Sequence, residues 1–181
     1  ADKCRALFEK IGYVSVLVNC AGLQPMESAV PAHELSEEVW DTILKVNLKG
    51  VWLMCKYMIP RSAVRSVIIN IASITASYAT KGIAAYAASK GGLLALTRAL
   101  AIEYAPNIRA VAISPGSVDT PLLRQTLAIQ SKTSDPDEAV AELGRAYPIG
   151  RIVTPEEVAR VVFFVASDMA SAITGTEIVV D

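Results

Sequence analysis

The sequence has few of the residues on which disulfide-rich and metal-binding proteins depend. It contains three cysteines and one histidine in 181 residues, and Cys4, Cys20 and Cys55 lie far apart without a CxxC pair. This number and spacing argue against a disulfide framework and against a zinc site. His33 lies in a polar loop without metal-binding or triad partners, which favours a surface role. We therefore expect no metal and a reducing, cytoplasmic location.

Charge of one sign and long apolar runs are also missing. The 17 basic and 18 acidic residues are interspersed and give a net charge of -1, so no basic patch predicts binding to nucleic acid or to a membrane surface. No apolar run approaches the roughly 20 residues that cross a bilayer. The first ten residues, ADKCRALFEK, have the charge pattern of an amphipathic helix and not of a signal peptide. We expect a soluble protein with small-molecule partners.

What the sequence does contain is an alternation of short β-branched runs and longer helical patterns. The chain is 52% hydrophobic, which suffices for one globular domain over residues 1–181. The expected strands are nearly continuous in apolar character, as parallel strands buried on both faces are. These strands are 14–19, 66–73, 108–114 and 176–181.

Three helices are expected between and after these strands. The first begins at the N-cap Ser36 and runs towards Pro60, the second covers about 84–104, and the third begins at Pro155 after the N-cap Thr154. Crossovers of this length predict βαβ units. The fold class is therefore α/β, a doubly wound parallel sheet with helices on both faces.

Residues 122–150 form a longer and more polar connection than an α/β unit needs. Such a segment at the carboxyl end of a strand is where these folds bind ligands, so we expect a substrate loop or lid. An ordinary surface excursion is the alternative. Leu122, Leu123 and Leu127 suggest a partly apolar ligand, but they would equally serve to pack against the sheet.

Tyr86 and Lys90 are the first pair that points to chemistry. They are four residues apart in an expected helix and therefore lie on the same face. A neighbouring ammonium favours the phenolate, which would lower the pKa of the phenol and make it a usable proton donor and acceptor. By spacing alone, however, such a pair is most often a solvated surface feature.

Polar and small residues at successive strand ends give this pair a context. Ser73 ends the second expected strand, and Asn47 is an amide in mid-helix, where asparagine is unfavourable. The remaining strand-end residues are Asn19, Ala21, Gly22, Pro115 and Gly116. Parallel strands end on one rim of the sheet, and that rim binds nucleotides in doubly wound folds.

Other hydroxyls nearby are weaker candidates. Thr75, Ser77 and Ser89 have no paired base, and helical geometry predicts that Ser89 points away from both Tyr86 and Lys90. Tyr78 is expected at the substrate mouth or on the surface, and Lys81 as a solvated loop charge.

In their order along the chain, these motifs resemble those of the classical short-chain dehydrogenases/reductases, over essentially the whole length. The matching stretches are NCAG, VNLKG, a serine thirteen residues before the tyrosine, YAASK, SPGSVDTP and TPEEVARVVFFVASDMASAITG. The chain is similar in equal measure to 3-oxoacyl-acyl-carrier-protein reductases and to sugar or cyclic-alcohol dehydrogenases. The resemblance implies a Rossmann-like fold and hydride transfer between NAD or NADP and a carbonyl/alcohol pair.

The resemblance also implies a role for each matching residue. Tyr86 would be the acid/base, Ser73 would hold the carbonyl oxygen, Lys90 would lower the Tyr86 pKa and bind the ribose hydroxyls, and Asn47 would hold a water in a proton relay. Further cofactor contacts are implied for Asn19, Ala21, Gly22, Pro115, Gly116, Val118 and Thr120. A homodimer or homotetramer is implied by helices 36–59 and 84–104.

Two features depart from the family pattern. Cys20 replaces the second asparagine of the Asn-Asn-Ala-Gly motif. The glycine-rich Gly-x-x-x-Gly-x-Gly turn does not occur, so we expect that roughly 60–80 residues of the family's N-terminal half are absent. Strand 14–19 would then be an exposed apolar edge, and the choice between NAD and NADP stays open. The alternatives are a non-catalytic nucleotide-binding or interaction protein on this fold, or an inactive truncated fragment.

Overall fold

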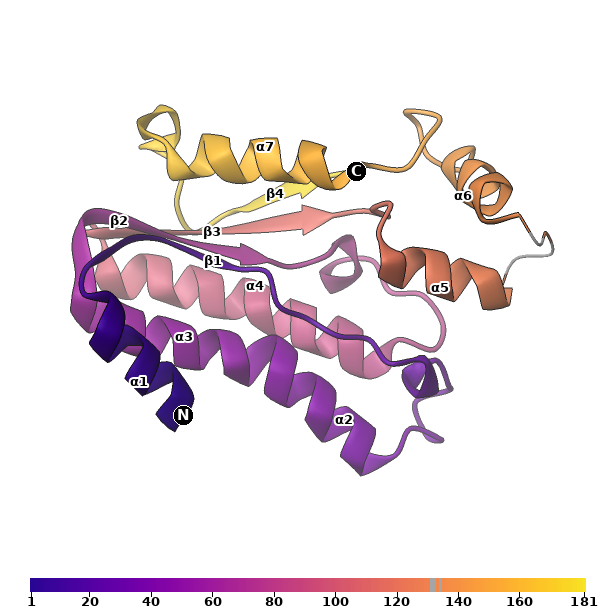
Figure 1. Ribbon diagram of the computed structural model, residues 1–181, viewed down its shortest axis with the longest axis horizontal. Coiled ribbons are helices and arrows are strands. Elements are labelled where there is room, and N and C mark those ends of the chain that lie inside the picture. Colours follow the sequence, from indigo (N-terminus) through magenta and orange to yellow (C-terminus); the bar gives the residue numbers. More distant parts are fainter. Residues whose placement is uncertain (131–132, 134) are drawn as a thin grey trace.

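Four parallel strands form one sheet in the computed structural model, which describes residues 1–130, 133 and 135–181 (Figure 1). The strands follow one another in sequence order across the sheet, and every neighbouring pair is parallel. They are β1 (Val14–Asn19), β2 (Ser62–Ile71), β3 (Ile108–Pro115) and β4 (Glu177–Val180). The carboxyl ends of all four strands therefore lie along one rim.

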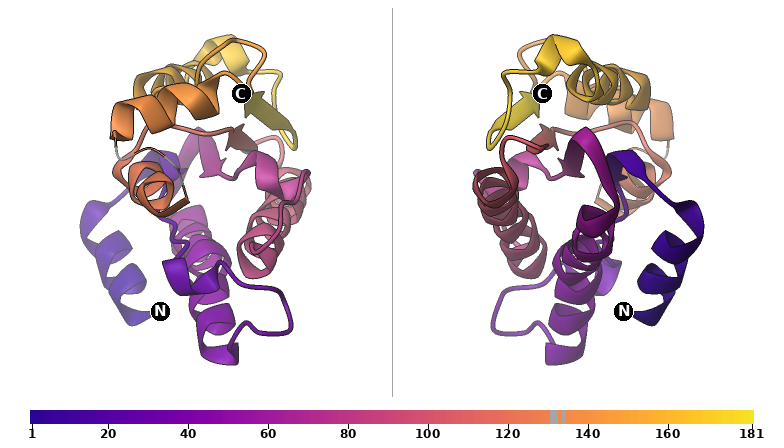
Figure 2. Two further views of the ribbon diagram at one scale, coloured as in Figure 1. Left: turned by 90° about the vertical axis from the view of Figure 1, so that its right-hand side faces the viewer. Right: turned by 90° about the vertical axis from the view of Figure 1, so that its left-hand side faces the viewer.

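Helices cover both faces of this sheet, as the doubly wound prediction requires (Figures 1 and 2). The helices on one face are α1 (Asp2–Ile11), α2 (Glu37–Leu44), α3 (Val51–Met58) and α4 (Ala84–Tyr104), and the opposite face carries α7 (Pro155–Ala166). Beyond the carboxyl ends of the strands lie α5 (Pro121–Gln130) and α6 (Pro136–Gly144). The expected lid 122–150 thus contains two helices, and residues 131, 132 and 134 of that prediction lie outside the described residues.

The starts of the first and third predicted helices are confirmed by their caps. The Ser36 hydroxyl accepts a hydrogen bond from the Val39 amide at 3.3 Å. Thr154 and Glu157 form a reciprocal capping box at the start of α7. In such a box each side chain satisfies a backbone N–H that has no partner within the helix.

The helix expected from Ser36 towards Pro60 forms, but its hydrogen-bond pattern changes along its length. A π-helical turn, Lys45–Gly50, separates α2 from α3, and the last residues before β2 form a short 3-10 turn. Asn47 lies within the π-helical turn. Such turns frequently coincide with functional sites, and an amide inside a helix was the sequence signal for this one.

The second strand starts earlier and ends earlier than expected. It begins at Ser62, and its pairing with β1 shifts between Val14 and Val16. Arg65, within β2 and just before its apolar part, has φ of 63°, in the left-handed region. The strand ends at Ile71, so Ser73 lies two residues beyond it.

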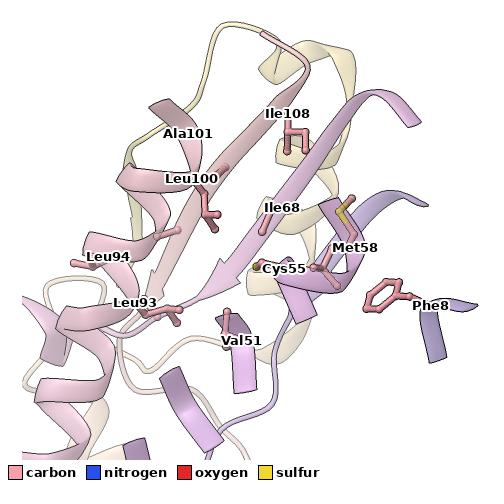
Figure 3. Packing of buried hydrophobic residues seen from close by; sticks show 14 residues of the cluster. Phe8, Val51, Cys55, Met58, Ile68, Leu93, Leu94, Leu100, Ala101 and Ile108 are labelled. Atoms are coloured by element: carbon pink, nitrogen blue, oxygen red, sulfur yellow. The ribbon is translucent and has the colours of Figure 1, made fainter. Parts of the chain in front are cut away.

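Two hydrophobic clusters hold the layers together. The larger one lies between the sheet and α1, α3 and α4, and Figure 3 shows its side chains, including Ile68 of β2 and Leu93 of α4. The smaller one joins the other face of the sheet to α7 around Val165. On β1, Val16 is 42% and Val18 40% exposed, which confirms the expected apolar exposure at this edge.

Within the described part of the chain, none of the helices is both long enough and apolar enough to cross a membrane.

Candidate active site

A cavity of ≈ 360 Å³ opens at the carboxyl rim of the sheet. Of the predicted site residues, it brings together Gly22, Ser73, Tyr86, Lys90, Pro115, Gly116, Val118 and Thr120. Asn19, Ala21 and Asn47 do not line it. Residues that the sequence reasoning did not assign to a contact complete the lining, and they include Cys20, Leu23, Gln24, Ser117 and Thr126.

Ser73 and Tyr86 both line this cavity. Ser73 lies at the start of the loop that follows β2, and Tyr86 lies in the first turn of α4 after that loop. Ser73 follows β2 and caps a short 3-10 turn, where its hydroxyl accepts hydrogen bonds from the Thr75 amide at 3.2 Å and from the Thr75 hydroxyl at 2.9 Å. Burial raises the pKa of Tyr86, and a hydrogen bond from Ser73 partly offsets this by stabilising the phenolate. The expected net lowering of this pKa by Lys90 is wrong in the structure, because burial outweighs the favourable contacts.

Lys90 is 4% exposed, although it carries an ammonium group. Its Nζ donates a hydrogen bond of 2.7 Å to the carbonyl oxygen of Ile71, the last residue of β2. The same Nζ lies 5.6 Å from the centre of the Tyr86 ring. Burial lowers the pKa of Lys90 to about 8, an effect that the nearby Cys20 partly opposes. The spacing of Tyr86 and Lys90 in the sequence thus correctly predicted that their side chains lie close together. They lie at the cavity and not on a solvated helix face.

Asn47 is fully buried behind the cavity and is fixed by the backbone of the loop after β1. Its Oδ1 accepts from the Leu23 amide at 2.8 Å, and its Nδ2 donates to the Leu23 carbonyl at 2.9 Å. A Cβ atom on Gly22 would lie 3.5 Å from Lys90 Nζ and 3.6 Å from Asn47 Oδ1. A side chain at this position would therefore be in van der Waals contact with both the ammonium group and the amide.

Ser89 contacts this amide, a role that sequence reasoning missed. It accepts a hydrogen bond from Asn47 Nδ2 at 3.2 Å and donates one of 2.7 Å to the Tyr86 carbonyl. The helical-geometry prediction that Ser89 points away from the Tyr86 and Lys90 side chains did not consider a partner on another helix. A serine in mid-helix that bonds back to a carbonyl of the preceding turn was the available signal.

A second buried network lies beneath the rim. Asn19 Nδ2 donates to Asn70 Oδ1 at 2.9 Å, and Asn70 Nδ2 donates to Thr97 Oγ1 at 2.9 Å. Asn19 Nδ2 also lies 3.6 Å from Cys55 Sγ. The Asn19 side chain is therefore directed into the protein and not into the cavity, so a cofactor contact at this residue would come from its backbone. An asparagine inside the apolar run SVIINIAS was the signal for Asn70.

The turn after β3 carries the remaining predicted residues. Residue Val118 pairs with Val153 in a parallel bridge, and Thr120 Oγ1 accepts from the Leu123 amide at 3.3 Å, which caps α5. Ser117 Oγ lies 2.6 Å from the hydroxyl of Tyr147, which follows α6. This turn is thus bonded to both ends of the 122–150 segment.

Most of the polar residues that we set aside lie on the surface, but Thr75 lines the cavity and Ser89 is buried. Tyr78 is 73% exposed and does not line the cavity, and Lys81 is exposed. The His33 side chain is 81% exposed and lies 3.5 Å from a carboxylate oxygen of Glu34.

Comparison with known proteins agrees with the family resemblance of the sequence motifs, and it does so along nearly the whole chain. A family model described as enoyl-(acyl carrier protein) reductase matches residues 2–181. The oxidoreductase UcpA of Escherichia coli (strain K12) is 37% identical over 177 residues, which are 96% of this chain and 66% of that protein. The 3-oxoacyl-[acyl-carrier-protein] reductase FabG of Thermotoga maritima is 36% identical over 187 residues, 99% of this chain and 71% of that protein.

Among solved structures, the ligand-free aldohexose dehydrogenase of Thermoplasma acidophilum superimposes with a TM-score of 0.94 at 37% identity. The match covers 99% of this chain and 72% of that one. The chain spans about two thirds of the length of the first curated relatives that it matches. Fold, motif order and these similarities agree, and the chain belongs to the short-chain dehydrogenase/reductase family of oxidoreductases.

Proposed function

We propose that the protein transfers a hydride between NAD or NADP and a carbonyl/secondary alcohol pair. The observation that carries this proposal is the convergence of Ser73, Tyr86 and Lys90 on one cavity at the carboxyl rim, with Asn47 buried directly behind it. The glycine at position 22 supports a cofactor there, since it lines the same cavity and has no side chain that would cover the Lys90 ammonium group. When bound, the nicotinamide supplies or accepts the hydride.

The chain's own residues would orient the substrate and move the proton. With its raised pKa, Tyr86 is protonated near neutral pH, the form that protonates a carbonyl oxygen during reduction. Ser73 would hold that oxygen by a hydrogen bond. Below its pKa of about 8, Lys90 is an ammonium group. It donates one hydrogen bond to the Ile71 carbonyl, and its remaining protons would be donated to the ribose hydroxyls.

Asn47 would complete the proton relay from behind the cavity. Its side-chain amide is already shared with the backbone of Leu23 and with Ser89, so a relay water would lie beside this network. The turn containing Gly116, Val118 and Thr120 would hold the carboxamide of the nicotinamide. The backbone of Asn19, Ala21 and Gly22 would face the adenosine ribose.

The natural full-length protein tests the catalytic assignment. Purified wild type is assayed with each reduced nicotinamide cofactor and a panel of neutral sugars, cyclic ketones and 3-oxoacyl thioesters, and absorbance of the cofactor is followed. We expect Tyr86→Phe to lower turnover by about 10³-fold, because the acid/base is lost. Tyr78→Phe removes an equivalent hydroxyl outside the cavity and should retain activity. Unchanged turnover in Tyr86→Phe would contradict the assignment.

The cavity lining leaves the substrate class broad. Leu23, Leu122 and Leu123 supply apolar wall, while Gln24 and Thr126 supply polar groups. The cavity of ≈ 360 Å³ would have to hold the nicotinamide ring together with the substrate, which limits the substrate to a small molecule. We therefore propose a small carbonyl or alcohol with both apolar and hydrogen-bonding parts.

We further propose that the protein acts as a homodimer or homotetramer through α2, the π-helical turn, α3 and α4. An apolar groove of ≈ 650 Å³ lies on this outer surface and includes Leu44, Leu48, Trp52 and Leu96. Trp52 is 42% exposed there. A Trp52→Glu substitution should convert the oligomer into a smaller species in light scattering, since it places a charge in an apolar interface. An unchanged mass would exclude this face.

A cytoplasmic location stays a prediction from composition.

A further inference from the structure

Arg124 on α5 joins three separate segments at the outer side of the cavity. Its Nε and Nη2 donate to the two carboxylate oxygens of Asp119, at 2.6 and 2.9 Å. Its Nη1 donates to Asp137 in the first turn of α6, at 2.8 Å. The guanidinium group thus holds Asp119 in a bidentate pair, the geometry that fixes orientation best, and it reaches a second carboxylate with its remaining nitrogen.

Asp119 belongs to the turn that faces the predicted cofactor position. Its neighbours Val118 and Thr120 both line the cavity. Its own amide donates to the Val153 carbonyl at 2.9 Å, and Val153 in turn donates to the Ser117 carbonyl at 3.0 Å. The backbone of the turn is therefore fixed on one side by Val153, and the Asp119 side chain is fixed on the other side by Arg124.

The α5 helix supplies the opposite, substrate-facing part of the lining through Leu122, Leu123 and Thr126. It starts directly on Thr120, whose carbonyl accepts from the Arg124 amide at 3.0 Å. A shift of α5 would therefore move Thr120 and change both parts of the cavity together.

We propose that Arg124 is a positioning residue that holds the substrate-facing helix α5 in register with the cofactor-facing turn 117–120. The Arg124 side chain is 37% and that of Asp137 83% exposed, so the ion pair between these two residues adds little to global stability. Their effect is on the relative placement of segments that carry cavity residues. This inference rests on the proposed function only for its kinetic test.

Hydrogen exchange on the natural full-length protein gives a readout independent of activity. In Arg124→Met, the amides of both the 117–120 turn and α5 should exchange faster, while those of α4 stay unchanged. Asp137→Asn removes only the arm to α6 and should accelerate exchange in α6 alone. Arg151→Met is the matched control, because it removes an ion pair of similar length, to Glu157, at the start of α7. Exchange that is faster in α5 but unchanged in the turn would overturn the proposal.

Kinetics separates positioning from general loosening. We expect Arg124→Met to raise KM for the carbonyl substrate about ten-fold, with kcat changed much less, since small misplacements act on binding geometry. Arg124→Lys should recover only part of this loss, because one ammonium group cannot bridge both acids in the same way. Equal effects of Arg124→Met and Arg151→Met on KM and melting temperature would indicate a structural role only. Absence of nicotinamide-dependent turnover in the wild type would contradict the proposed function but leave the exchange test intact.

Discussion

The inner side of the cavity and its outer wall are held by different kinds of interaction. The inner side consists of Asn47, Ser73, Tyr86 and Lys90, and short hydrogen bonds to backbone fix its two most buried members, as in the 2.7 Å bond from Lys90 to Ile71. The outer wall consists of α5, α6 and the chain up to the start of α7. Arg–carboxylate pairs that are partly or fully exposed tie it together.

This difference assigns the two sides different tolerances. A buried polar group that loses its partner pays the full cost of desolvation, whereas an exposed ion pair is screened and replaceable by water. The inner side therefore keeps one geometry, as proton transfer requires. The outer wall depends on ion pairs whose loss costs less, so it should tolerate substitution of their members better.

After Tyr86→Phe, the largest effect is expected from breaking the inner side at Lys90. Lys90→Met should lower turnover by about 10²-fold, because a charged donor beside the reacting groups is lost. In the wild type, reduction should proceed at a constant rate below pH 8 and slow above it, as the group with a pKa of about 8 loses its proton. The variant should lack this decline. Lys81→Met, which removes an exposed charge, is the control, and a wild-type profile without a decline near pH 8 would contradict the role of Lys90.

The second test asks whether the inner side is as intolerant as its burial implies. Asn47→Leu leaves the amide and carbonyl of Leu23 without their side-chain partners, so the free energy of unfolding should fall by about 3 kcal/mol. Ser89→Ala removes one contact to the same amide and should cost about 1 kcal/mol. Urea unfolding measures both. If Asn47→Leu lowered the free energy of unfolding by less than Ser89→Ala does, water would have replaced the lost hydrogen bonds.

The contrast between the two sides also explains what the sequence could predict. Tyr86 and Lys90 are one helical turn apart, and Ser73 follows the end of a strand. Helical periodicity and parallel sheet topology therefore sufficed to predict that the three residues lie close together. The four strands and the start of α7 followed from the same local patterns. The resemblance to a family added roles to these residues but not their surroundings.

Local pattern could not predict contacts between distant segments. The Asn19–Asn70 bond links residues 51 apart, and nothing in either stretch names its partner. The side chain of Asn47, in the π-helical turn, is bonded to the backbone of Leu23, which lies 24 residues away. The pKa of Tyr86 was predicted in the wrong direction for the same reason, since spacing identifies a charged neighbour but not the burial that outweighs it.

The smallest effect is expected from the exposed ion pair at the start of α7. Arg151 donates to both carboxylate oxygens of Glu157, at 2.8 and 2.7 Å, and the Thr154 amide donates to the same carboxylate at 2.9 Å. These bonds lower the pKa of Glu157 to about 2 from its ordinary 4.5. A depressed carboxylate pKa stabilises the fold above the unfolded value and loses this contribution as the pH falls through the folded one. The window is therefore about pH 4.5 to 2.

Glu157→Gln isolates the charge in this pair, because glutamine still accepts the hydrogen bond from Thr154 that completes the capping box. The wild type should lose stability more steeply than the variant between pH 4.5 and 2, and added salt should reduce the difference by screening. Glu156→Gln removes the same charge from the same helical turn and serves as the control. Thermal unfolding across this range measures all three proteins. An equal change in slope for both variants would mean that net charge, and not the pair with Arg151, sets the acid stability of the outer wall.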